Sequence, residues 1–496
     1  MVFSSYLFIF FFLPLALLSY YLAPRRARHL VLTISSYVFY GWANPAFTLI
    51  MMLSTAIDWV AGLKIAGAPI FPRGGSGGEI PVLEPGGPRS RQQKIFLAVS
   101  MTANLALLGF FKYFHFAVDS WNGVASSFGF DAALIETTLK VVLPLGISFY
   151  TFQSMSYAID VYRGETAALR NPIDFACFVA MFPQLVAGPI IRFSEVADQL
   201  RERSHTIAKF ARGVVFFSFG LAKKVLIANS CGRLADVAFG AGELAFFDAW
   251  LGIVAYAFQI YFDFSGYSDM AIGLGLMFGF SFPKNFDSPY LSRSITEFWR
   301  RWHMSLSRWL RDYLYVSLGG NRKGRGRTYV NLALVMLLGG LWHGASWNFV
   351  IWGAFHGAWL IFERWRSERA AARGEAPARP VGLRAVPSVA FTFVLVLISW
   401  VFFRAADLAH AGRYLESMFL LGESSARAAL VSGVLVRPYT FVALGIGAVV
   451  VWLAPQSWDF SRHLPWWKAL WALSLLVLSL VVLGTQGFNP FIYFIF

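Results

Sequence analysis

Three histidines lie in segments whose other residues are mostly apolar or aromatic. His343 and His356 belong to GGLWHGASWNFVIWGAFHG (339–357), and His303 belongs to EFWRRWHMSLSRWLRDYLYV (297–316). A buried imidazole that stays neutral can take a proton from a hydroxyl group, so it could act as the base in a group-transfer reaction. The competing interpretation is a neutral histidine that is hydrogen-bonded within a packed core.

The surroundings of each histidine favour different interpretations. Gly339, Gly340 and Gly344 flank His343 and would leave room for a substrate, so a functional role is favoured there. His356 stands on what reads as regular helix, where a structural role is favoured. His303 falls on an apolar stripe, so the residue pattern alone favours packing over chemistry.

That stripe is part of a predicted amphipathic helix over 297–316. At about 100° per residue, the apolar side chains fall on one side and the arginines on the other. Such a helix is suited to the cytoplasmic surface of a membrane, where its arginines would contact lipid headgroups. The apolar side holds Trp299, Trp302, Leu306, Trp309, Leu310, Tyr313 and Leu314, and the opposite side holds Arg300, Arg301, Arg308, Arg311 and Asp312.

The composition indicates an integral membrane protein. Of the 496 residues, 57% are hydrophobic and 14% are charged, whereas soluble domains carry about 25% charged residues. We predict an all-α polytopic fold with roughly 11 membrane segments, the first of them Ser5–Leu22. The net charge of +15 comes from short basic clusters between apolar runs, which is typical of cytoplasmic loops and argues against nucleic-acid binding.

The charge pattern also predicts how the chain runs through the membrane. A turn is expected at GWANP (41–45), and a broken, re-entrant segment is expected at 175–193. Basic residues flank the apolar run 329–362 on both sides, so this run should enter and leave by one face with a turn near HGAS. His343 would then lie deep in the membrane, although a single kinked crossing is an alternative.

Several polar residues accompany the histidines. Asp263 and Asp269 interrupt an apolar run in YFDFSGYSDMAIG and could line a cavity. The histidine spacing does not resemble a metal site, because no Cys, Asp or Glu is near enough in sequence to complete a coordination shell. We therefore predict no bound metal and no bound cofactor.

Five collinear stretches together resemble the membrane-bound O-acyltransferase (MBOAT) family, in the bacterial branch of alginate O-acetylases and teichoic-acid D-alanyl transferases. They are PLGISFYTFQSMSYAIDVYRG (144–164), FPQLVAGPIIRF (182–193), YFDFSGYSDMAIGLGLMFGFSFPKNFDSPY (261–290), FWRRWHMSLSRWLRDYLYVSLGGNR (298–322) and LWHGASWNFVIWGAFHG (341–357).

This resemblance implies a ring of helices, including re-entrant and interfacial ones, around a thin central cavity. It implies that His343 and His303 match the two family histidines, and we predict both as catalytic residues. Residues 1–385 would form the catalytic core and 386–496 additional transmembrane helices. We predict donor or substrate contacts at Arg300, Arg308, Asp263, Asp269, Asn285 and His356.

The resemblance also implies an activity. Such enzymes take an acyl group from a cytoplasmic thioester, here expected to be acetyl-CoA, and deliver it across the bacterial inner membrane. The expected acceptor is an exopolysaccharide such as alginate. A periplasmic or membrane-anchored acetyltransferase partner is expected to complete the transfer, because this chain has no sizeable soluble domain to hold a polymer.

Two alternatives stay open at this point. A same-family enzyme could acylate peptidoglycan or teichoic acid instead. A protein of another class, a glycan transporter or flippase, would explain the cavity residues and the topology, but it would leave the WRRWH and LWHG motifs without a role.

Overall fold

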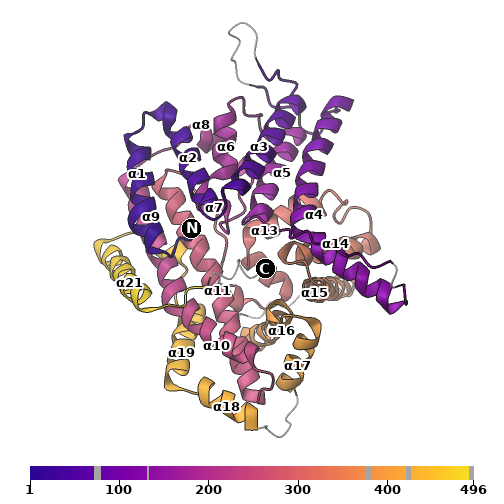
Figure 1. The fold of residues 1–496 in the computed structure, drawn as a ribbon, viewed down its shortest axis with the longest axis vertical. Helices are drawn as coiled ribbons and strands as arrows, with labels where there is room; N and C mark the ends of the chain where they lie inside the picture. The colour runs from indigo at the N-terminus through magenta and orange to yellow at the C-terminus, as the bar shows by residue number, and fades with distance from the viewer. Residues whose placement is uncertain (72–79, 131–132, 375–380, 420–425, 491–496) are drawn as a thin grey trace. The chain divides into compact units, whose positions relative to one another are not determined.

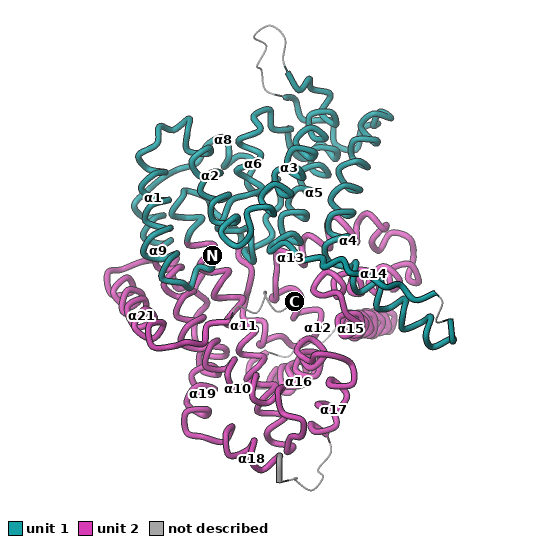
Figure 2. Tube along the Cα trace, in the orientation of Figure 1, with its two compact units in different colours: residues 1–213, 274–283 teal, residues 214–273, 284–496 magenta. Residues whose placement is uncertain are grey.

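A computed structural model describes residues 1–71, 80–130, 133–374, 381–419 and 426–490. Helices account for all the regular secondary structure in these ranges, which confirms the predicted all-α fold (Figure 1). The chain divides into two compact units, residues 1–213 with 274–283 and residues 214–273 with 284–496 (Figure 2). The predicted boundary at residue 385, between a catalytic core and additional transmembrane helices, differs from the boundaries of these two units and stays a prediction.

Helices of unit 1 begin where capping residues stand in the sequence. Asn44 accepts a hydrogen bond from the Ala46 amide at the start of α3, and Pro45 takes the first helical position, so the predicted turn at GWANP is confirmed. Ser90 and Gln93 form a reciprocal capping box at the start of α4. The elements are η1 (Leu7–Phe12), α1 (Leu13–Leu22), η2 (Arg25–Ala27), α2 (Arg28–Gly41), α3 (Pro45–Ile65), α4 (Arg91–Ser127), α5 (Ile147–Arg163), α6 (Pro172–Ala180), α7 (Phe182–Leu185) and α8 (Phe193–Arg201).

Unit 2 contains all three histidines singled out above. Two helices, α9 (Ile207–Ala222) and α11 (Phe246–Met277), continue from one unit into the other. The remaining elements are η4 (Lys223–Ala228), α10 (Asn229–Gly240), η5 (Pro289–Leu291), α12 (Ile295–Arg301), α13 (Met304–Trp309), η6 (Leu310–Tyr315), α14 (Arg325–His343), α15 (Trp347–Ala372), η7 (Gly382–Ala385), α16 (Val386–Arg404), α17 (Leu408–Phe419), α18 (Ala426–Leu435), α19 (Pro438–Trp452), α20 (Ser457–Phe460) and α21 (Trp466–Thr485).

Five helical stretches in the described residues are long and apolar enough to cross a membrane. They are Pro45–Ile65, Arg91–Ser127, Ile207–Gly240, Gly382–Arg404 and Trp466–Thr485. A sixth span results if the pair Ala428–Leu435 and Pro438–Trp452, bent by 62°, is one broken crossing. The expected number of about 11 is therefore not confirmed, because several expected spans are short or interrupted helices.

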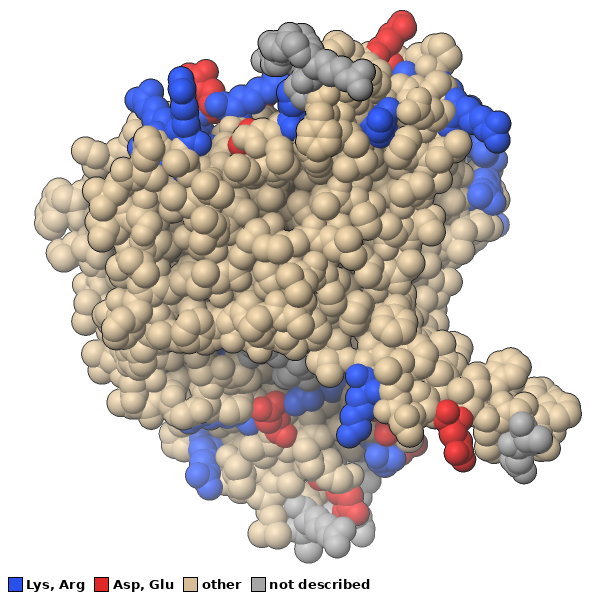
Figure 3. Space-filling view, turned by 45° about the horizontal axis from the view of Figure 1, so that its top comes forward, with Lys and Arg blue, Asp and Glu red and all other residues tan. Residues whose placement is uncertain are grey.

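Apolar side chains on the outside of these helices fit a lipid environment. Only 17% of the apolar window in α4, and the same share in α21, is buried inside the structure. Leu470, Val477 and Val481 of α21 are each more than half exposed. Water would not stabilise such a surface, whereas lipid would. On the face that it displays, Figure 3 shows wide areas without charged side chains, with Lys, Arg, Asp and Glu at their edges.

Candidate active site

His343 ends α14 and stands at the turn that joins this helix to α15. The helix stops at His343, Gly344 is extended, and α15 starts at Trp347, so the predicted turn at HGAS is confirmed. The position of His343 deep in the membrane stays a prediction. The side chain of His343 is half-buried, unlike those of the other two histidines.

Small residues let α14 and α15 run against each other up to this turn. A Cβ atom added at Gly340 would overlap the carbonyl oxygen of Phe349, and one added at Gly353 would overlap that of Met336. The two backbones are thus in direct contact at both positions. Glycine is required there because the neighbouring atom is backbone and cannot turn aside. This packing fixes the position of His343 relative to α15.

His303 lies at a break in the helix predicted over 297–316. The structure places two short helices there, α12 and α13, separated by Trp302 and His303, so the prediction of one continuous helix is wrong. His303 has φ of 43°, a left-handed conformation that is uncommon for a residue with a side chain. The predicted sidedness nevertheless holds, since Trp302, Leu306 and Trp309 are buried.

The loop before η5 holds this break in place. The amide of Met304 donates to the carbonyl of Asn285 at 2.8 Å, and the amide of Asp287 donates to the carbonyl of Arg301 at 2.9 Å. The side-chain oxygen of Asn285 accepts from both the amide and the hydroxyl of Ser305, at 3.1 and 2.9 Å. These contacts satisfy groups that a continuous helix would have paired internally, and so they offset the cost of the bend.

Aromatic side chains connect the three histidines in one packed cluster. The ring of Trp342 lies 6.2 Å from that of His303 and 5.0 Å from that of His343, measured between centroids. Trp352 continues the series, with its ring 5.2 Å from that of His343 and 4.8 Å from that of His356. The packing of these rings thus brings together residues that are up to 53 positions apart in the sequence, 303 to 356.

His303 is neutral in this setting. Its side chain is fully buried, and the ring of Phe264 packs on it in a T-shaped arrangement, with 4.6 Å between the ring centroids. Burial, and to a smaller extent the nearby His343, lower the pKa of His303 well below its ordinary value of 6.5. The α12–α13 junction lies outside the five apolar spans. His303 therefore carries no charge at neutral pH.

His356 has a structural role in the described contacts. Its Nδ1 accepts a hydrogen bond from the indole of Trp299 at 3.3 Å, because an indole can only donate. Its Nε2 lies 3.2 Å from the hydroxyl of Ser399, which donates its own proton to the carbonyl of Val396. Nε2–H is then the donor to Ser399, and both ring nitrogens are occupied in joining α12, α15 and α16.

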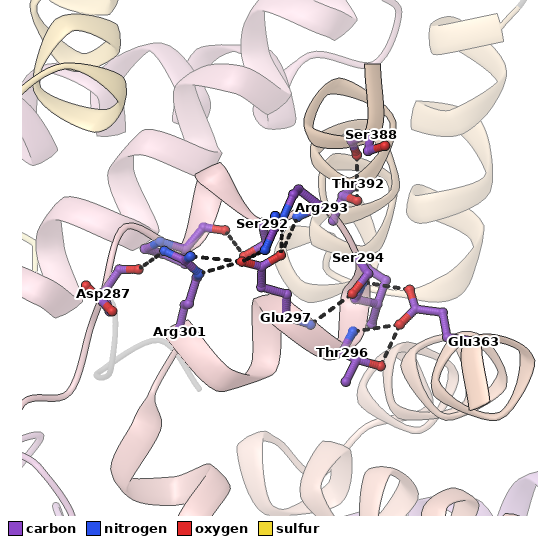
Figure 4. A network of polar contacts seen from close by, with 12 residues as sticks. Asp287, Ser292, Arg293, Ser294, Thr296, Glu297, Arg301, Glu363, Ser388 and Thr392 are labelled. Atoms are coloured by element: carbon purple, nitrogen blue, oxygen red, sulfur yellow. Dashed lines mark hydrogen bonds and ion pairs between the residues drawn. The ribbon is translucent and has the colours of Figure 1, made fainter. Parts of the chain in front are cut away.

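A polar network anchors α12 on both sides (Figure 4). The carboxylate of Glu363 accepts from the amides of Ile295 and Thr296 and from the Thr296 hydroxyl, at 2.7, 2.9 and 2.5 Å. It thereby satisfies backbone donors at the helix start that have no partner within the helix. Since Glu363 belongs to α15, this contact ties the helix before His303 to the helix that carries His356.

Glu297 lies between two arginines of the same network. Arg293 and Arg301 each reach its carboxylate, at 2.9 and 2.8 Å. Burial alone would raise the pKa of Glu297, but the hydrogen bonds from Arg293 and Arg301 outweigh it and lower the pKa to about 2. A cavity of about 590 Å³ opens beside this group, walled by Val386, Phe393 and other apolar side chains.

The predicted donor-contacting arginines and aspartates have distinct surroundings. Arg300 is exposed and Arg308 is half-buried. Asp263 pairs with Lys224 and Asp269 pairs with Lys223, both at 2.7 Å. The cavity beside Asp269 and Asn285 has a volume of about 10 Å³, which is room for about one water molecule.

The sequence reasoning missed three features of this site. Lys223 and Lys224 precede their aspartate partners by 46 and 39 positions, so residue spacing gives no signal for these pairs. Glu363 has no distinguishing pattern in the sequence, because it stands at the end of an apolar run. The role of Asn285 as the residue that holds the bend at His303 depends on a contact across 18 positions. A Pro-Lys-Asn-Phe-Asp loop directly after a long helix was the available signal.

Comparisons with known proteins identify the family of this chain. Residues 166–403 match the membrane-bound O-acyltransferase family. The probable alginate O-acetylase AlgI of Azotobacter vinelandii is 50% identical over 423 residues, covering 85% of this chain and 79% of that protein. The corresponding protein of Pseudomonas putida is 45% identical over the full length of both chains. The peptidoglycan O-acetyltransferase of Helicobacter pylori is 37% identical, covering 84% of this chain and 80% of its own.

The chain belongs to the membrane-bound O-acyltransferase family and is an O-acyltransferase. Within that family its similarity to O-acetylases supports membrane O-acetyl transfer as its reaction. The fold and the apolar helices agree with a polytopic membrane enzyme.

Proposed function

We propose that this enzyme takes an acetyl group from acetyl-CoA on the cytoplasmic side of the inner membrane and passes it outward for O-acetylation of an exopolysaccharide such as alginate. The observation that carries the proposal is the position of His343 at the α14–α15 turn, next to a neutral, buried His303, in a chain similar to alginate O-acetylases.

His343 is the proposed base. It takes the proton of the acceptor hydroxyl while that oxygen attacks the thioester carbonyl carbon. A carbon–oxygen bond forms, the carbon–sulfur bond breaks, and the departing thiolate receives the proton from the His343 imidazolium. An alternative sequence has two such transfers, with the acetyl group held briefly on the enzyme. Both sequences require an imidazole that substrate can reach, and the half-buried side chain of His343 meets this requirement.

Arg300 and Arg308 are proposed to attract the phosphates of the donor. A guanidinium group binds phosphate through paired, charge-assisted hydrogen bonds. Arg300 is exposed on α12, next to the junction that carries His303. The contacts of Asp263 and Asp269 with lysines support structural roles for these two residues rather than donor binding. The contacts of His356 support the same conclusion.

The proposal includes a partner protein on the periplasmic side. The apolar runs along the sequence predict no sizeable soluble domain that could hold a polymer. We therefore expect a periplasmic or membrane-anchored acetyltransferase to receive the acetyl group and place it on the polysaccharide. Deleting such a partner should abolish polymer acetylation without reducing the membrane abundance of this enzyme.

Thiol release distinguishes this proposal from a transporter. Membranes containing the enzyme should release free coenzyme A from acetyl-CoA, and the rate should fall in His343→Ala membranes of equal enzyme content. Glycan movement that depends on a coupling ion, without thiol release, would instead favour the transporter. Peptidoglycan is the second candidate acceptor, because a peptidoglycan O-acetyltransferase is 37% identical. Mass analysis of both polymers from one strain decides between the two acceptors.

A further inference from the structure

The carboxamide of Asn285 contacts both Ser305 and His303. Its oxygen accepts from the Ser305 amide at 3.1 Å and from the Ser305 hydroxyl at 2.9 Å. A backbone N–H can only donate, so the atom that faces it must be the oxygen of the carboxamide and not its nitrogen. The same oxygen lies 3.3 Å from Nδ1 of His303.

Nδ1 must therefore be the protonated nitrogen of His303. An amide oxygen has no proton to give, so this contact is a hydrogen bond only if Nδ1–H donates. The Ser305 hydroxyl does not change this assignment, because it lies 3.5 Å from Nδ1 but 2.9 Å from the Asn285 oxygen to which it donates. In a neutral imidazole the other nitrogen, Nε2, then holds a free lone pair.

No hydrogen bond among the described residues uses the lone pair on Nε2. Nε2 is buried, and no hydrogen-bond partner for it is found among the described residues. His356 is the contrasting case, since its two ring nitrogens are both engaged by neighbouring side chains. A buried acceptor without a partner is destabilising, and a ligand that donates to Nε2 would remove that cost.

The backbone holds the ring in one orientation. The left-handed φ of 43° at His303 is kept by the bond from the Met304 amide to the Asn285 carbonyl. Asn285 thus binds the bend through its main chain and the imidazole through its side chain. The rings of Phe264 and Trp342 pack on the histidine from α11 and α14.

We propose that Asn285 is a positioning residue that fixes His303 as the Nδ1–H tautomer, so that Nε2 can accept a hydrogen bond from a donor group of the bound substrate. This inference rests on the proposed function, since it assigns His303 a contact with the substrate of that reaction. It replaces the sequence-based expectation that Asn285 itself binds the donor or substrate.

Two charged groups near Asn285 are paired, and His343 is a titratable neighbour that acts on His303. Lys284 pairs with Asp287 at 2.7 Å, and Lys223 pairs with Asp269 at 2.7 Å beside the small cavity that Asn285 lines. Protonation of His343 disfavours a second positive charge on His303.

The tautomer can be measured directly in the full-length enzyme in detergent or nanodiscs. Histidine labelled with 15N reports it, because protonated and unprotonated ring nitrogens have well-separated chemical shifts. The His303 signals are those missing from the spectrum of His303→Gln. We expect the wild type to have a protonated Nδ1 and an unprotonated Nε2 at neutral pH.

Two substitutions of Asn285 and one matched control test whether Asn285 determines the tautomer of His303. Asn285→Leu removes the acceptor and should produce the other tautomer or a mixture. Its acetyl transfer should fall by about 100-fold to 10,000-fold, the range of a lost acid–base contact. Asn331→Leu removes another buried carboxamide of unit 2, which donates to the Gly320 carbonyl at 2.8 Å, and should leave the His303 signals unchanged.

Asn285→Asp gives a readout that a purely structural role would not change. Its carboxylate still accepts from Nδ1–H and keeps the tautomer, but its negative charge favours the imidazolium. The acidic limb of the activity–pH profile should therefore move to higher pH. Should Asn285→Leu fail to fold, the wild type and Asn285→Asp decide between the outcomes.

A protonated Nε2 in the wild type, or an unchanged tautomer in folded Asn285→Leu, would overturn the inference. An acidic limb that stays in place in Asn285→Asp would do so as well. The spectra do not depend on turnover. If wild-type membranes release no thiol from acetyl-CoA while the tautomer is as expected, the proposed function fails and the tautomer assignment stands.

Discussion

Replacing Gly353 with alanine should force α14 and α15 apart just below the turn that carries His343. The added Cβ would overlap the carbonyl oxygen of Met336, a backbone atom that can move only if the helix moves. Overpacking of this kind costs about 1–3 kcal/mol. Alanine recovers about 1 kcal/mol through its better helix propensity. The net destabilisation should therefore reach about 2 kcal/mol.

Gly357 supplies the matched control one turn further along α15. A Cβ added there would lie 3.4 Å from the Cβ of Met336, at the edge of ordinary contact. Gly357→Ala should thus be neutral or stabilising by up to about 1 kcal/mol. The two variants change the same residue type on the same helix, so they differ chiefly in whether α14 has room for the methyl group.

Stability and activity should be measured on both variants at equal membrane abundance. Gly353→Ala should lower the unfolding temperature in detergent, and acetyl transfer should fall by up to about 100-fold, because small displacements of a catalytic group have effects of that size. Gly357→Ala should keep the wild-type unfolding temperature and the wild-type rate of acetyl transfer. Wild-type stability and activity in Gly353→Ala would refute the claim that backbone contact between the two helices positions His343.

Substitutions at three further positions test the network around α12. Glu363→Ala should destabilise the enzyme by about 1–3 kcal/mol, because the amides of Ile295 and Thr296 lose their acceptor. Glu363→Gln should lose less stability, and the unfolding temperatures of the two variants test this difference. The folded state lowers the pKa of Glu297 to about 2, so its contribution to folding stability is complete above its ordinary pKa of 4.5 and is lost as the pH falls towards 2. The unfolding temperature of Glu297→Gln should therefore lack this part of the acid decline. Identical plots of unfolding temperature against pH for the wild type and Glu297→Gln would contradict the assignment. His356→Ala should lower stability by about 1–3 kcal/mol, since it leaves the Trp299 indole without its acceptor, yet activity per folded molecule should persist; its complete loss would point to a chemical role.

Local sequence pattern predicted the parts of the site that depend on neighbouring residues. The turn at HGAS follows from glycines next to an apolar run with basic flanks, and the buried side of 297–316 follows from helical spacing. The break at His303 does not follow from spacing. It requires a left-handed residue other than glycine, and the Asn285 loop that stabilises it is distant in sequence.

The same limit applies to the charged residues. The sequence pattern predicts Asp263 and Asp269 as cavity residues because they interrupt an apolar run. Their partners, Lys224 and Lys223, stand on a π-helical turn after α9, and only the fold brings the four side chains together. The family and the reaction class were accessible from the motifs, whereas the contacts that sort catalytic from structural residues were not.

The most direct test of the account is the O-acetyl content of extracellular polysaccharide from a strain that carries His343→Ala. The variant protein should reach the membrane at wild-type abundance, and mass analysis should find the polymer without O-acetyl groups. The account predicts this loss because His343, at the turn between α14 and α15, is the proposed base. Wild-type acetylation in the His343→Ala strain would contradict it.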